Sequence, residues 1–135
     1  MYIDNLKRQH TEIYSSIKML KGFIDKKMSE EDYAEMAKTV SVLAGILKVH
    51  LQSEDKFLYP ELLKNKDEAI SNMAKEYIDD MGNIGKKFEE YKNKYNTKIK
   101  VCDNVLSLKK DTEEVLNLLV NRLNKEDKAL YPLIN

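Results

Sequence analysis

Residues 50–60 of this chain read HLQSEDKFLYP, and residues 122–132 read RLNKEDKALYP. Seven of these eleven positions are identical at an offset of 72 residues. A weaker match, at an offset of 67, places residues 6–17 over residues 73–84. The second half of the chain therefore repeats the first. This repeat predicts a duplicated helical hairpin whose halves are related by a pseudo-twofold axis.

Four stretches carry apolar residues at the three- and four-residue spacing of amphipathic helices, and strand patterns are absent. The four stretches are residues 3–20, 33–58, 70–88 and 105–130. Ser29 and Asp32 form a near relative of the capping box before the second stretch, and Asp103 is a good N-cap for the fourth. Long helices with short connections predict an all-α, antiparallel up-down four-helix bundle. The length of 135 residues predicts a single domain, residues 1–135.

Composition excludes several classes of partner. The chain has 23 basic and 23 acidic residues, so its net charge is zero, which argues against nucleic acid or an anionic membrane as a partner. No stretch approaches the roughly 20 apolar residues of a membrane span. The first residues lack the pattern of a secretory signal, and the single cysteine, Cys102, forms no internal disulfide. We therefore expect a cytoplasmic protein.

The two histidines of the chain, His10 and His50, both lie on stripes that otherwise hold apolar residues. Glu54 follows His50 by four residues and so lies on the same helix face, and the repeat places Glu126 at the equivalent position. Imidazole nitrogens and carboxylate oxygens that meet in a bundle core suit a borderline divalent metal, chiefly iron, with manganese or zinc as alternatives. Buried carboxylates without a cation would cost several kcal/mol each or become protonated. The pattern therefore predicts a positive group between them.

His10, then His50-x-x-x-Glu54 with its LYP sequence, then Glu126 with a second LYP sequence, resemble the hemerythrin-like, HHE cation-binding family. The resemblance covers nearly the whole chain and implies a four-helix bundle with two irons in its core. It implies that His10 and His50 bind the first iron. It also implies that Glu54 and Glu126 are the carboxylates that bridge the two metals.

The second half departs from the family pattern. Arg122 takes the place of the fourth-helix histidine, and the third helix offers Tyr77. Arginine cannot ligate a metal but pairs well with carboxylates, so we predict that Arg122 lies at the second metal position and bonds Glu126 and Glu54. In the alternative, Arg122 extends along a helix flank and pairs with a surface acid. Tyr77 is either a phenolate ligand of ferric iron or a neutral phenol that bonds a carboxylate.

Other conspicuous residues receive no chemical role. Tyr59 and Tyr131, in the two LYP sequences, are expected to pack at the end of the bundle. Asp55 and Asp127 follow the two glutamates by one residue and so point about 100° away from them. They are expected to be solvated or paired with neighbouring lysines.

Two functions follow from this pattern. The first is a metal-binding protein with a single non-haem iron that binds or senses oxygen or nitric oxide, or that handles iron. The second is a metal-free structural or interaction bundle whose former metal site is filled by a network of Arg122 and carboxylates. An iron-dependent oxidation enzyme ranks last, because the sequence identifies no catalytic residue and no substrate pocket.

Overall fold

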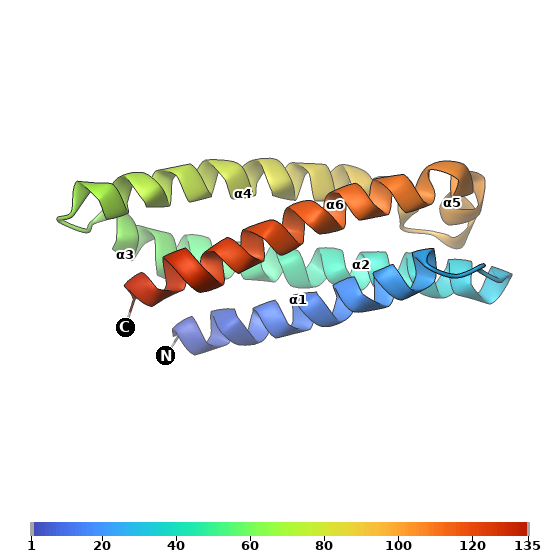
Figure 1. The fold of residues 1–135 in the computed structure, drawn as a ribbon, viewed down its shortest axis with the longest axis horizontal. Helices are drawn as coiled ribbons and strands as arrows, with labels where there is room; N and C mark the ends of the chain where they lie inside the picture. Colours follow the sequence, from blue (N-terminus) through green and yellow to red (C-terminus); the bar gives the residue numbers. More distant parts are fainter. Residues whose placement is uncertain (1, 135) are drawn as a thin grey trace.

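The four predicted helices are present in the computed structural model, which describes residues 2–134. They are α1 (Tyr2–Ile24), α2 (Glu30–Ser53), α4 (Glu68–Tyr95) and α6 (Val105–Lys125). Figure 1 shows them side by side, with both termini at one end of the bundle. α1 and α4 each pack against both α2 and α6. All regular structure described for residues 2–134 is helical, so the predicted all-α four-helix bundle is confirmed.

The apolar stripes explain how these helices pack. On α1 the stripe is buried along its whole length, from Ile3 to Leu20. Ser29 and Asp32 form the complete capping box that starts α2, because the Ser29 hydroxyl accepts from the Asp32 backbone N–H at 3.2 Å and the Asp32 carboxylate accepts from the Ser29 N–H at 2.9 Å. Asp67 caps α4 with a single bond, because its carboxylate accepts from the backbone N–H of Ala69 at 2.9 Å.

The start of the last long helix differs from the prediction. Asp103 is not an N-cap, because it ends a short helix, α5 (Lys98–Asp103), whose N-cap is Thr97. The Thr97 hydroxyl accepts from the Lys100 backbone N–H at 3.2 Å and so begins helical structure six residues earlier than expected. Val105, predicted to face inward, is 42% exposed at this boundary.

Each half of the bundle contains a π-helical turn at the same point of the repeat. Residues Glu54–Leu58 follow α2, and residues Glu126–Leu130 follow α6. A proline comes two residues after each turn, in the short helices α3 (Tyr59–Leu63) and Tyr131–Leu133. Proline has no N–H to donate, and in an α-helix its ring clashes with the carbonyl four residues earlier. The wider π-helical turn before the proline avoids this clash. The two turns support the duplication inferred from sequence.

Two apolar clusters enclose a polar layer near one end of the bundle. The larger cluster fills the middle and the far end, and the smaller contains Leu6, Leu58 and Leu130. On α1, His10 lies between Leu6 of the smaller cluster and Ile13 of the larger one. No helix within residues 2–134 has the length and apolar character needed to cross a membrane.

Candidate metal centre

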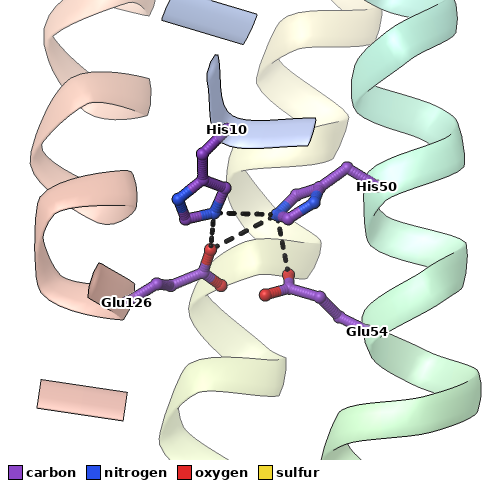
Figure 2. A group of neighbouring side chains, drawn as sticks. All are labelled: His10, His50, Glu54 and Glu126. Atoms are coloured by element: carbon purple, nitrogen blue, oxygen red, sulfur yellow. Dashed lines mark hydrogen bonds and ion pairs between the residues drawn. The ribbon is translucent and has the colours of Figure 1, made fainter. Parts of the chain in front are cut away.

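Four side chains from three parts of the chain meet in this polar layer. His10 comes from α1 and His50 from α2, while Glu54 and Glu126 are the first residues of the two π-helical turns. His10 is 2% exposed and the other three are fully buried. Each offers one nitrogen or oxygen atom, and these atoms all lie within 4.8 Å of one another. The structure thus brings together the four residues singled out in the sequence (Figure 2).

The spacing of the donor atoms matches a coordination shell. His10 Nε2 lies 2.9 Å from Glu126 Oε1 and 3.1 Å from His50 Nε2. His50 Nε2 lies 3.4 Å from both Glu126 Oε1 and Glu54 Oε1. Metal–nitrogen and metal–oxygen bonds of about 2.0–2.2 Å place neighbouring ligand atoms roughly 3.0–3.5 Å apart. The four residues therefore fit a single metal ion.

In each histidine ring, Nδ1, the nitrogen that faces away from the centre, lies within hydrogen-bond distance of an acceptor. His50 Nδ1 lies 2.8 Å from Gln9 Oε1, and His10 Nδ1 lies 2.8 Å from Asp127 Oδ1. Because an amide oxygen and a carboxylate accept hydrogen bonds, both rings donate from Nδ1 and turn Nε2 toward the centre. The two Nε2 lone pairs then face each other and Glu126 Oε1. A positive species, a metal ion or protons, is needed between these atoms.

Sequence reasoning did not find these two partners. Asp127 was expected to point away from the site, and this was wrong. It lies in the π-helical turn, where the angle between successive side chains differs from that of an α-helix. Gln9 is 7% exposed, and its amide also donates to Ser53 Oγ at 3.2 Å. The burial of this polar residue beside His10 depends on the contact of α1 with α2, which the α1 stripe alone does not reveal. Asp55 is exposed, as predicted.

The pKa values of the two carboxyls are shifted in opposite directions. Burial raises the pKa of Glu54 well above its usual value, and the negative charge of Glu126 raises it further. Burial also acts to raise the pKa of Glu126, but hydrogen bonds from His10 and His50, which require a proton on Nε2 in place of a metal ion, outweigh it and lower this pKa to about 2. The two pKa values are therefore displaced in opposite directions, and without a cation Glu126 is the more readily ionised of the two carboxyls.

Glu54 also has an unsatisfied oxygen. Its buried Oε1 has no hydrogen-bond partner, and its 3.4 Å contact with His50 Nε2 is an ion pair only if that ring is protonated. Buried polar atoms in folded proteins are almost always satisfied, so this one needs an explanation. A cation bound among the four residues would satisfy it and would favour ionisation of both carboxylates.

The two tyrosines of the repeat also reach this centre, although sequence reasoning gave them only a packing role at the bundle end. The Tyr131 hydroxyl donates to Glu54 Oε2 at 2.9 Å and lies 2.9 Å from His10 Nε2. The Tyr59 hydroxyl donates to Glu126 Oε2 at 3.4 Å. Each tyrosine thus bonds the carboxylate of the other half. The π turns explain this, because residues five apart lie nearly one above the other there but about 140° apart in an α-helix.

A family model described as the hemerythrin HHE cation binding domain matches residues 1–134 of the chain. The chain belongs to the hemerythrin HHE family. No curated protein and no solved structure matched it. The resemblance inferred from the sequence is therefore confirmed over nearly the whole chain. This hemerythrin domain contains a buried group of two histidines and two glutamates that could hold a metal ion.

The second half of this hemerythrin domain carries Arg122 where the first half carries His50. Arg122 is only 4% exposed, yet it forms its ion pair with Asp80, a largely exposed acid on α4. Its Nε and Nη1 atoms have no hydrogen-bond partner in the described part of the chain. The predicted bonds from Arg122 to Glu126 and Glu54 are therefore wrong. A partner at the edge of the bundle keeps its contact with water, which lowers the desolvation cost of the pair.

Tyr77, on α4, packs against this arginine. The Arg122 guanidinium carbon lies 4.5 Å from the centroid of the Tyr77 ring. The Tyr77 hydroxyl donates to the backbone carbonyl of Lys125 at 3.4 Å, so the expectation of a carboxylate partner is wrong. Burial raises the pKa of Tyr77. Arg122 and Tyr77 thus pack against each other in the half of the bundle where the family resemblance predicts histidines.

Proposed function

We propose that this hemerythrin domain binds a single non-haem iron ion through His10, His50, Glu54 and Glu126. The observation that carries the proposal is the convergence of four buried donor atoms within 4.8 Å, together with the unsatisfied Oε1 of Glu54, which lies 3.4 Å from His50 Nε2. Two imidazoles with one or two carboxylates resemble the facial ligand set of non-haem ferrous sites, which leaves coordination positions open. Manganese and zinc suit the same donors.

The second half of the domain supports one ion and not two. A guanidinium keeps its charge and cannot ligate a metal, and Arg122 lies at the position where the family resemblance predicts a histidine. Within residues 2–134, His10, His50, Glu54 and Glu126 form the one group of three or more such side chains that is spaced to hold a metal ion. The buried charge of Arg122 would also disfavour a second cation beside it.

We further propose that the ligand of the iron is oxygen or nitric oxide. Bound iron would supply reversible binding of such a molecule at its open position. The four donor residues are 0–2% exposed, so a molecule that reaches them through the packed bundle must be small. Gln9 and Asp127 fix the orientation of the two imidazoles, and the two carboxylates neutralise a ferrous ion in the buried centre.

Metal analysis after anaerobic titration with ferrous iron tests this proposal. We expect one iron per chain in the wild type and almost none in His50→Ala, which loses a ligand. Lys48→Ala, an exposed position on the same helix, should bind iron as the wild type does. Nitric oxide added to the ferrous protein should change its visible spectrum. Two irons per chain, or none in the wild type, would overturn the proposal.

A further inference from the structure

A fifth oxygen lies within the proposed metal centre. The Tyr131 hydroxyl is 2.9 Å from His10 Nε2, 2.9 Å from Glu54 Oε2 and 3.4 Å from Glu126 Oε1. Tyr131 is itself 2% exposed, and its ring packs on the His10 ring with centroids 5.0 Å apart. We infer that Tyr131 supplies a fifth ligand, its phenolate oxygen, when this centre holds a trivalent ion such as ferric iron. The inference rests on the proposed function and deepens it.

The contacts of Tyr131 parallel those of His50. His50 Nε2 lies 3.1–3.4 Å from His10 Nε2, Glu126 Oε1 and an oxygen of Glu54. The Tyr131 oxygen is within 3.4 Å of the same three residues. These separations are those of neighbouring ligands around one ion with bonds of about 2.0–2.2 Å. Tyr131 therefore completes a set of five donors around the same centre as His50.

The charge balance of the centre explains why the phenolate would bind a trivalent ion and not a divalent one. Glu54 and Glu126 neutralise a divalent ion, and a trivalent ion in the same buried centre leaves one positive charge uncompensated. When the trivalent ion binds, the O–H bond of Tyr131 breaks, the bond from its oxygen to the metal forms, and the proton is released to the buffer. The centre is then neutral. With a divalent ion, Tyr131 stays a neutral phenol that donates to Glu54.

The repeat supplies a matched control. Tyr59 occupies the position equivalent to Tyr131, and its hydroxyl reaches the centre through one carboxylate oxygen, Glu126 Oε2, at 3.4 Å. Tyr131 touches a histidine and both carboxylates. Loss of the Tyr59 hydroxyl should therefore leave the metal ligands in place.

The test is a titration of the metal-free protein with ferric nitrilotriacetate, followed by visible absorption and by iron analysis after desalting. We expect the wild type to develop a phenolate-to-iron charge-transfer band that saturates at one iron per chain. Tyr131→Phe should lose this band, and its affinity for ferric iron should fall at least about tenfold more than its affinity for zinc, for which it loses only the hydrogen bond to Glu54. Tyr59→Phe and Tyr77→Phe should keep the band. Resonance Raman spectra of the ferric wild type, which do not depend on any variant folding, should show enhanced tyrosine vibrations.

The outcomes separate this inference from the function on which it rests. A wild type that binds one ferric iron without the band, or a Tyr131→Phe variant that keeps it, would overturn the role of Tyr131 and leave the single-iron site standing. Loss of the band in Tyr59→Phe alone would assign the ligand to the other half and likewise overturn the inference. A wild type that binds neither ferrous nor ferric iron would overturn both proposals.

Discussion

At the scale of single residues, the sequence predicted which four side chains meet in the polar centre but not the groups around them. His10, His50 and Glu54 were recognisable because polar residues on apolar stripes need a reason to be buried, and the repeat then pointed to Glu126. The partners of the histidine rings come from neighbouring helices. Their contacts depend on how the helices are rotated against one another, and the periodicity of one helix does not contain that information.

Asp127 offers a test of these partners. Its carboxylate accepts the hydrogen bond of His10 Nδ1 at 2.8 Å, which orients the ring and makes Nε2 a stronger electron donor. Asp127→Asn removes the charge and should weaken ferrous or zinc binding about tenfold, measured by competition with a chelator. The control is Asp55→Asn, the exposed counterpart in the repeat, which should bind as the wild type does. Equal affinities in the two variants would show that Asp127 does not act on the metal.

At the scale of helices, the amphipathic stripes predicted where the long helices lie but not which segments are π-helical. The stripes continued correctly through Leu58 and Leu130, yet both segments are π-helical. Apolar spacing over a few residues does not distinguish the two windings, and this hid the inward position of Tyr59 and Tyr131. The Asp103 prediction failed for a related reason. The hydroxyl of Thr97 started a helix before it, in a stretch whose polar composition resembled a loop.

The capping box of α2 gives a prediction at this scale. Ser29→Ala removes the hydroxyl that satisfies the Asp32 backbone N–H, and it should lower the free energy of unfolding by about 1 kcal/mol in urea denaturation. Iron per chain should not change, because the cap lies at the far end of α2 from His50. Ser41→Ala, at an exposed position within α2, is the control and should not destabilise the protein. A similar decrease in the free energy of unfolding in both variants would show that the cap does not stabilise the protein.

At the scale of the whole molecule, a polar centre near one end of the bundle lies between two apolar clusters. The clusters explain why the bundle could be predicted from the sequence, since most of their residues come from the four stripes. The sequence did not predict which polar groups form hydrogen bonds between neighbouring helices. At the far end of the bundle from the termini, for example, Asp111 on α6 accepts hydrogen bonds from Lys94 and Tyr95 of α4, at 2.8 and 2.6 Å.

This far-end link makes stability depend on pH. Hydrogen bonds from Lys94 and then Tyr95 hold the pKa of Asp111 below its usual value. A carboxyl whose pKa is lowered by folding stabilises the protein above its unfolded pKa of about 3.9, and this contribution is lost as the pH falls through the folded pKa. Asp111→Asn should therefore cost about 0.5–1 kcal/mol near pH 7, after allowance for solvent screening.

The measurement is urea denaturation of Asp111→Asn and the wild type at several pH values. The difference between them should shrink as the pH falls below about 4, where the wild-type carboxyl takes up its proton. Asp79→Asn, an exposed position on α4, is the control and should show little difference at any pH. A cost that stays constant down to pH 2 would mean that the charge of Asp111 contributes nothing.

A crystal structure of the iron-loaded protein, with iron located by its anomalous scattering, tests the central claim most directly. One strong iron peak per chain should appear within bonding distance, about 2.0–2.3 Å, of donor atoms from His10, His50, Glu54 and Glu126. Arg122 should remain paired with Asp80, with no peak beside it or Tyr77. A second iron in that half of the bundle, or a fully loaded protein whose iron lies away from the four residues, would contradict the account.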